Sequence, residues 1–143
     1  MGNLAALEYI CDTGIDLEGL TDNQGFSPLT LAAKLHKDTL TNYISLRFNK
    51  LDNEDPEGLT IFSRYILKNS FDLATKFMQR GCNVNYQNRD KRTPLTLAIL
   101  RGNEDAVKYL LGKGADPHYE DLTGKDSCDY ALKSDIFKYY SVF

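Results

Sequence analysis

The chain is built on a period of 33 residues. Related segments begin at positions 22, 55, 88 and 121, with no residue gained or lost between copies. The four copies begin DNQGFSPLTLA, DPEGLTIF, NRDKRTPLTLA and DLTGKDSC. A fixed period of this length is typical of structural units that cannot bury their apolar side alone and therefore stack on their neighbours. The sequence thus predicts a solenoid, in which each unit contacts mainly the units before and after it.

The third copy shows how one unit folds. Thr93 can cap a helix by accepting a hydrogen bond from an early backbone N–H, and Pro94 suits the first helical turn, where its missing N–H costs no bond. Gly102 offers the left-handed conformation that ends a helix. A second helix is expected over 104–113 and is closed by Gly114. Its apolar seam consists of Ala106, Val107, Leu110 and Leu111.

Helices in the other copies follow by adding or subtracting the period. First helices are predicted near residues 27–35, 60–68, 93–101 and 126–133, and second helices near 38–47, 71–80 and 104–113. The segments between copies carry turn residues, including Gly25, Gly58 and Gly124, whereas Arg89-Asp90-Lys91 in the third copy lacks the glycine.

The first two copies depart from this pattern. In the second copy, Ile61 replaces the proline and Arg64-Tyr65 replaces the Leu-Ala pair. Because a small residue lets neighbouring helices approach closely, a tyrosine must either widen the stack or fill space left by a neighbour. In the first copy, Arg47-Phe48 stands where the later second helices end in glycine. Each departure is either neutral variation or a groove or kink shaped for a partner.

The period, the turn residues and the capped Pro-Leu-Thr-Leu-Ala start of the first helix resemble the ankyrin repeat. This resemblance implies an all-α fold, a solenoid of stacked helix-turn-helix units whose connecting segments project as β-turn fingers. It also implies a single domain over residues 1–143. The expected parts are a partial repeat 1–21, repeats 22–54, 55–87 and 88–120, and an incomplete terminal repeat 121–143.

Both ends of the chain fall inside a repeat. The seam of a second helix occurs at both ends, in Ala6, Leu7, Ile10 and Cys11 and again in Tyr139, Tyr140 and Phe143. Terminal repeats of a finished solenoid need a polar outer face. The apolar ends therefore favour a piece of a longer array, and the alternative is a natural chain with an aromatic cap.

Composition narrows the partners and the compartment. A formal net charge of -3 provides no broad basic field, so we expect no nucleic-acid partner. No apolar run approaches the length that spans a bilayer, so no membrane insertion is expected. Three cysteines, an odd number, indicate reduced thiols in the cytoplasm or the nucleus rather than a disulfide framework. We expect a monomer.

Catalytic, cofactor and metal sites are not expected. His36 occupies the position that ends a first helix, and His118 lies in a later loop, so neither is placed beside a nucleophile. A metal needs clustered ligands, which two histidines and scattered cysteines do not supply. The segment Gly112-Lys113-Gly114 lacks the other residues of a phosphate-binding loop and lies at a helix C-terminus. The chain is therefore not expected to be an enzyme.

Partner binding is better supported. The ankyrin resemblance places a set of apolar and basic residues on the fingers and on the exposed side of the first helices: Phe26, Leu35, Leu59, Leu67, Lys68, Arg92, Leu100 and Arg101. Exposed apolar groups with a charged rim are what a protein interface requires. The alternative is that leucines late in a first helix tuck against the next repeat.

These observations favour a non-catalytic module that captures a protein or peptide on its concave face of fingers and first helices. The alternative is a segment of a larger enzyme or membrane protein, in which the repeats recruit substrate or regulate their own catalytic domain. A third reading is a spacer whose surface binds nothing specific. The full-length reading frame separates the first two hypotheses.

Overall fold

The computed structural model describes residues 13–14 and 16–133. They fall into two compact units, the first ending at Ile61 and the second beginning at Phe62. All regular secondary structure in the described residues is α-helical, which confirms the predicted fold class, and each of these helices is too short to span a bilayer. The apolar seams expected at residues 6–11 and 139–143 lie outside the described residues.

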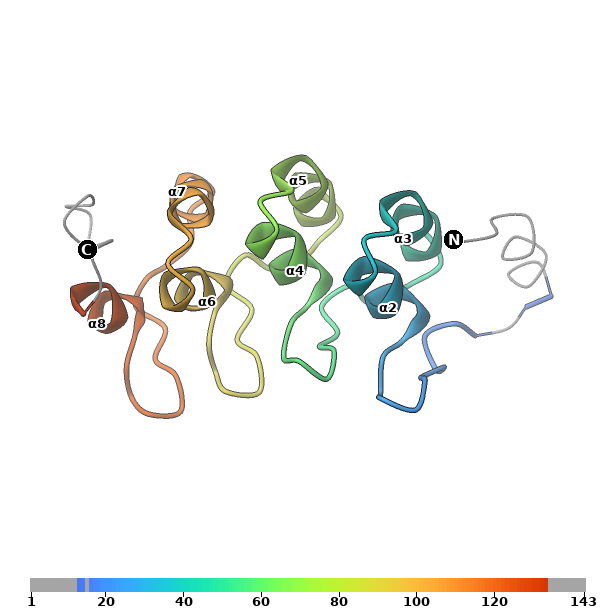
Figure 1. The fold of residues 1–143 in the computed structure, drawn as a ribbon, viewed down its shortest axis with the longest axis horizontal. Helices are drawn as coiled ribbons and strands as arrows, with labels where there is room; N and C mark the ends of the chain where they lie inside the picture. The colour runs from blue at the N-terminus through green and yellow to red at the C-terminus, as the bar shows by residue number, and fades with distance from the viewer. Residues whose placement is uncertain (1–12, 15, 134–143) are drawn as a thin grey trace. The chain divides into compact units, whose positions relative to one another are not determined.

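The first unit contains a helix hairpin made of α2 (Pro28–Lys34) and α3 (Asp38–Ser45), which pack on each other (Figure 1). Ser27 caps α2, because its hydroxyl accepts a hydrogen bond from the Thr30 N–H at 3.2 Å while the Thr30 hydroxyl accepts one from the Ser27 N–H at 2.9 Å. Pro28 is the first helical residue, as the pattern predicts.

The second unit repeats this design. Its helices are α4 (Ile61–Leu67), which starts at the last residue of the first unit, α5 (Phe71–Gln79), α6 (Pro94–Leu100), α7 (Glu104–Gly112) and α8 (Ser127–Leu132). Within this unit α4, α6 and α8 form one layer, and α5 and α7 form a second layer (Figure 1). Thr93 caps α6, since its hydroxyl accepts a hydrogen bond from the Thr96 N–H at 3.3 Å.

The ends of the helices match the predicted ranges within two residues. The largest difference is at α3, which ends at Ser45 rather than at 47. The chain has no glycine there, and Leu46 remains in the right-handed helical region. Phe48 instead becomes buried, and its N–H donates to the Ser45 carbonyl at 3.2 Å. A buried aromatic residue therefore replaces the glycine that closes the later second helices.

The helices α2, α4 and α6 each connect to the following helix through a residue with positive φ. His36 (φ 59°) and Asn69 (φ 61°) occupy the position of Gly102 (φ 67°). The fold thus requires the left-handed conformation at this position even where the residue is not glycine. The left-handed conformation destabilises a residue that has a Cβ by roughly 1–2 kcal/mol.

Tyr65, the tyrosine that replaces alanine in the second copy, lies in the core. Its side chain is fully buried and stacks on Phe77, with ring centroids 5.6 Å apart and planes inclined by 16°. The Lys68 Nζ lies 4.6 Å from the centre of the same Tyr65 ring. The tyrosine thus lies in the interior against Phe77 of α5, at the position where the neighbouring repeat has the small Ala98.

Candidate functional site

The connecting segments are fingers closed by two hydrogen bonds each. In the finger 88–92, the Asn88 N–H donates to the Arg92 carbonyl at 3.0 Å, and the Lys91 N–H donates to the Asn88 carbonyl at 2.7 Å. The side-chain oxygen of Asn88 also accepts from the backbone N–H groups of Asp90 (2.9 Å) and Arg92 (3.0 Å). These bonds define a tight turn of the β type, as the repeat predicts.

The same arrangement recurs in the other three fingers. Asp22, Asp55 and Asp121 each accept two backbone N–H bonds with Oδ1, from residues two and four positions further on. The turn of each finger is therefore held by its own first residue, and the Leu122 N–H also donates to the Asp90 carbonyl of the preceding finger at 3.1 Å. At the finger tips of the second unit, the exposed residues include Arg89, Asp90, Lys91 and Leu122.

Phe26 and Leu59 are not accessible, and the expectation that they are exposed on the fingers is wrong. Their side chains are only 3% and 4% exposed. Each is the fifth residue of its finger, with its N–H bound to Asp22 or Asp55. Both side chains are apolar, and their burial is favourable. The Lys34 Nζ covers the Phe26 ring at 4.3 Å from its centre and also pairs with Glu57 at 3.0 Å.

The residues expected late in the first helices are more accessible. Leu35 and Leu100 are 54% and 45% exposed, Arg101 is exposed, and Leu67 and Lys68 are half-buried. In the second unit, Asn103 ties the end of α4 in place. Its Nδ2 donates to the Asn69 side chain at 2.8 Å and to the Leu67 carbonyl at 3.4 Å.

Arg92 has a structural partner that the sequence did not indicate. Its Nε lies 3.3 Å from Oδ2 of Asp121, whose side chain is almost fully buried. The Tyr130 hydroxyl donates to the same carboxylate oxygen, and the Arg92 guanidinium lies 5.8 Å from the Tyr130 ring centre. Arg92 therefore joins two successive fingers of the second unit, and only about a third of its side chain is exposed.

Asp121 is held in its charged form by this network. Burial alone would raise its pKa, but hydrogen bonds from the Thr123 and Tyr130 hydroxyls and from the backbone N–H groups of Thr123 and Lys125 outweigh that effect. Together they hold the pKa of Asp121 well below its usual range. The network thus gives the last finger an anion that matches the cationic Arg92.

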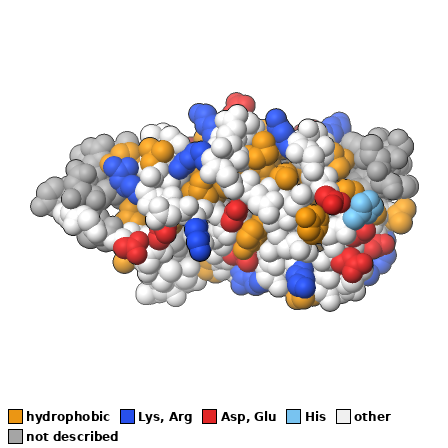
Figure 2. All heavy atoms as spheres, turned by 180° about the vertical axis from the view of Figure 1, so that it is seen from behind, with side chains coloured by type: hydrophobic (Ala, Val, Ile, Leu, Met, Phe, Trp, Pro, Cys, Tyr) orange, Lys and Arg blue, Asp and Glu red, His pale blue; other side chains and the backbone are white. Residues whose placement is uncertain are grey.

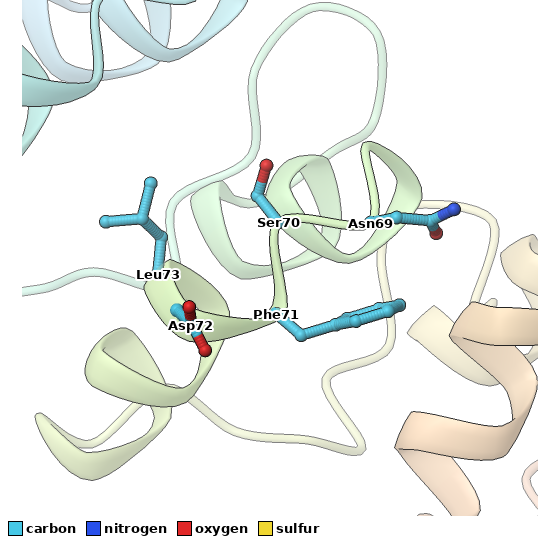
Figure 3. Close-up of a pocket in the computed structure, with 5 residues that line it drawn as sticks. All are labelled: Asn69, Ser70, Phe71, Asp72 and Leu73. Atoms are coloured by element: carbon cyan, nitrogen blue, oxygen red, sulfur yellow. The ribbon is translucent and has the colours of Figure 1, made fainter.

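A groove of about 380 Å³ lies at the start of α5 and is lined by Asn69, Ser70, Phe71, Asp72 and Leu73. Phe71 and Leu73 point in different directions in Figure 3. Phe71 stacks on Tyr109, with ring centroids 4.7 Å apart, and the Tyr109 hydroxyl is hydrogen-bonded to Thr75. The groove combines an amide, a hydroxyl and a carboxylate with apolar walls, groups that suit hydrogen bonding to a peptide.

His118, Asp126 and Cys128 form a cluster that was missed from sequence. The His118 Nδ1 lies 3.5 Å from an Asp126 carboxylate oxygen and 3.8 Å from the Cys128 Sγ. The expectation that the histidines and cysteines are too scattered to cluster is therefore wrong for these residues. Burial raises the pKa of Cys128, with a further contribution from the charges of Asp126, Asp129 and Asp116. In the sequence, only the close spacing of Asp126 and Cys128 pointed to this cluster. Folding brings His118 to them.

The described surface mixes apolar and charged side chains. On the face drawn in Figure 2, hydrophobic side chains lie in small groups between basic and acidic ones. Exposed leucines include Leu35, Leu46, Leu100, Leu122 and Leu132.

Known proteins with similar sequences carry the same repeat. A family model described as "Ankyrin repeats (3 copies)" matches residues 31–121. Phosphocholine transferase AnkX of Legionella pneumophila is 31% identical over an alignment that covers 79% of this chain and 14% of the relative. Inversin of Gallus gallus is 32% identical, covering 69% of this chain and 10% of the relative. Palmitoyltransferase AKR1 of Saccharomyces cerevisiae is 27% identical over an alignment that covers 86% of this chain and 16% of the relative. The chain thus spans at most about a sixth of the length of these three relatives.

Proposed function

Because this chain belongs to the ankyrin-repeat family, we propose that it binds a protein or peptide partner and catalyses no reaction itself. Ankyrin repeats generally mediate protein–protein interaction. The observation that carries the proposal is the exposure of Leu100 beside Arg101 at the end of α6, in a repeat whose finger 88–92 is held by hydrogen bonds to the Asn88 side chain. Exposed apolar anchors beside a cation, on a frame that need not reorganise, keep the cost of binding low.

The binding face proposed for the second unit has three parts. Its apolar anchors are Leu67 and Leu100, its cations are Lys68, Arg101 and the exposed part of Arg92, and its rim is the tip of the finger 88–92. Leu35 contributes an equivalent exposed leucine in the first unit. Phe26 and Leu59 are buried and are therefore not part of the proposed contact. The cations favour a partner segment that carries carboxylates.

The experiment compares capture of the partner by wild-type protein and by a Leu67→Glu, Leu100→Glu variant. Proteins retained by the immobilised wild type are identified, and the affinity of each is then measured with purified components. The double variant should lose its partner, since interface anchors commonly contribute about 2 kcal/mol or more each. Leu46→Glu is the control for adding a glutamate at an exposed leucine outside the proposed face, because Leu46 is exposed and follows directly after α3 in the first unit.

Two outcomes oppose the proposal. If the double variant loses its helical circular dichroism, these leucines belong to the core, as the alternative from sequence holds. If it stays folded and binds as tightly as the wild type, the binding face lies elsewhere.

The second candidate is a recruiting or regulatory segment of a larger enzyme or membrane protein. Two of the three relatives are transferases by name, and the chain covers only 14% and 16% of them. Under this reading the same face holds a substrate protein or the catalytic domain of its own polypeptide. The sequence of the complete transcript decides between the two, since it shows whether a catalytic or membrane-spanning segment is encoded with these repeats. In either case we propose a monomeric module in the cytoplasm that binds protein rather than nucleic acid.

A further inference from the structure

The start of α8 brings together three different metal-ligating side chains. The ligand atoms of His118, Asp126 and Cys128 all lie within 4.8 Å of one another. His118 comes from the loop after α7, whereas Asp126 is the N-cap residue of α8 and Cys128 lies in its first turn. We propose that His118, Asp126 and Cys128 form a binding site for a divalent transition-metal ion, and that Zn²⁺ fits it best.

The two distances from His118 are close to those of tetrahedral coordination. Zn²⁺ binds histidine nitrogen and carboxylate oxygen at about 2.0–2.2 Å and thiolate sulfur at about 2.3 Å, so tetrahedral ligands lie roughly 3.4 Å apart for N and O and roughly 3.6 Å apart for N and S. The corresponding distances here are 3.5 Å between His118 and Asp126 and 3.8 Å between His118 and Cys128. The ligand atoms of Asp126 and Cys128 lie within 4.8 Å of each other, and side-chain rotation has to bring them to roughly 3.6 Å for all three ligands to hold one ion.

The backbone that carries the ligands is fixed by bonds of its own. Ser127 lies between two of the ligands, and its hydroxyl is hydrogen-bonded to Thr96 in the core at 3.0 Å. The Ser127 N–H donates to the Pro117 carbonyl at 3.0 Å, and the His118 N–H donates to the Asp116 carboxylate at 2.9 Å. The loop and the helix start are therefore held together without the metal, as a preorganised site requires.

Asp126 can serve the helix and the metal at once. Its Oδ1 accepts the capping hydrogen bond from the Asp129 N–H at 3.0 Å, and its Oδ2 is the oxygen that faces His118. Binding through Oδ2 therefore leaves the cap of α8 intact.

The ligand set selects among metals. One nitrogen, one sulfur and one oxygen suit a borderline ion such as Zn²⁺, whereas Ca²⁺ and Mg²⁺ prefer oxygen ligands alone. Three protein ligands leave the fourth position for water or for a side chain of a partner. His118 is 69% exposed, so an ion and a fourth ligand can both reach the site from solvent.

Cobalt(II) is the probe for the first test, because its thiolate complexes absorb through sulfur-to-metal charge transfer. The complete, untagged and reduced chain is freed of metal with a chelator and titrated with Co²⁺, then with Zn²⁺. We expect one Co²⁺ per chain, a charge-transfer band, and loss of that band when Zn²⁺ displaces the cobalt. Absence of the band in the wild type overturns the proposal. Persistence of the band in Cys128→Ser also overturns it, because Cys11 or Cys82 would then be the ligand.

Single variants identify the other two ligands. Asp126→Asn keeps a helix cap of equal quality but loses the charge, and His118→Ala removes the nitrogen. Removing a group that fixes a metal site commonly weakens binding about 10- to 100-fold, so we expect at least a tenfold increase in the Zn²⁺ Kd for each variant.

His36→Asn is the matched control, because His36 is the other histidine of the chain and asparagine tolerates its positive φ. Its Zn²⁺ Kd should equal that of the wild type. Circular dichroism verifies that each variant is folded. Cys128→Ser changes the fewest atoms and serves as the deciding variant if another variant fails to fold. If the Zn²⁺ Kd of Cys128→Ser is less than ten times the wild-type Kd, the site is contradicted.

Discussion

Nε of Arg92 lies 3.3 Å from Oδ2 of Asp121, which connects the last residue of one finger to the first residue of the next. Three features distinguish this pair from an ordinary surface ion pair. The carboxylate is buried, Tyr130 donates to the same oxygen, and the other oxygen holds the turn that begins at Asp121. Breaking the pair therefore leaves a buried charge without its main counterion, a situation that is more costly than losing an exposed pair.

We expect acid to weaken the second unit through Asp121. Its pKa is lower in the folded chain than its ordinary value of 3.8, so its charged form stabilises the fold above that value. This contribution is lost as the pH falls below about 4 towards the folded pKa. Asp121→Asn, which copies the asparagine of the preceding finger, removes the charge and so should cost about 1.5–3 kcal/mol at pH 7.

Urea unfolding of both proteins between pH 7 and pH 2.5 measures this effect. The difference in unfolding free energy between wild type and Asp121→Asn should narrow steadily below pH 4. A difference that stays constant over that range would show that the Asp121 charge contributes nothing.

Lys91→Gly should stabilise the protein. Lys91 has a φ of 58° at the finger position where Gly25, Gly58 and Gly124 have φ values of 94°, 79° and 78°. A left-handed backbone conformation destabilises a residue with a Cβ by roughly 1–2 kcal/mol, and glycine removes this cost. Glycine also makes the unfolded chain more flexible, which offsets part of the gain. We therefore expect a gain of about 0.5–1 kcal/mol in thermal or urea unfolding. Lys91→Ala is the control for the loss of the ammonium group and should leave stability nearly unchanged.

Tyr65→Ala should be among the most destabilising substitutions in the second unit. The ring is fully buried and stacked on Phe77, so its removal leaves a cavity between α4 and α5. Replacing a buried aromatic side chain by alanine commonly costs about 3–5 kcal/mol. Tyr65→Phe preserves the stack and should cost much less. A loss of under 1 kcal/mol in the unfolding free energy of Tyr65→Ala would contradict this prediction and would show that the neighbouring helices close the space.

Arg101→Ala should slow association with an acidic partner mainly at low salt. Arg101 is exposed, and exposed charges act chiefly on the association rate, where dissolved ions screen them. Surface plasmon resonance at 20 mM and 500 mM salt provides the comparison. Arg92→Ala is expected to behave differently, because it also lowers the unfolding free energy through Asp121. Equal effects of Arg101→Ala at the two salt concentrations would oppose electrostatic selection of the partner.

The repeat pattern predicted the helices closely because each helix is specified locally. Ser27 and Thr93 cap the helices that follow them, and the position of Gly102 ends the first helices in left-handed geometry. These signals lie within a few residues of the structure they specify. Even His36 and Asn69, which are not glycines, adopt the left-handed conformation that the register predicts.

The proposed binding and metal sites depended on contacts between segments distant in sequence. Sequence position alone could not show whether the fifth finger residue points outward, and the structure buries Phe26 and Leu59 while it leaves Leu100 exposed. Likewise, a motif search centred on close spacing finds Asp126 and Cys128 but not His118, which lies ten residues before the cysteine.

The sequence by itself determined the 33-residue period, the all-helical class and the positions of the helices, because turns, caps and apolar seams act over short stretches of chain. Only the tertiary structure decided that Tyr65 fills the interior, that Arg92 is bound to Asp121 and that His118 meets Asp126 and Cys128. Side-chain burial and the meeting of charged groups depend on how separate segments pack. That packing is a property of the folded unit and not of any one repeat.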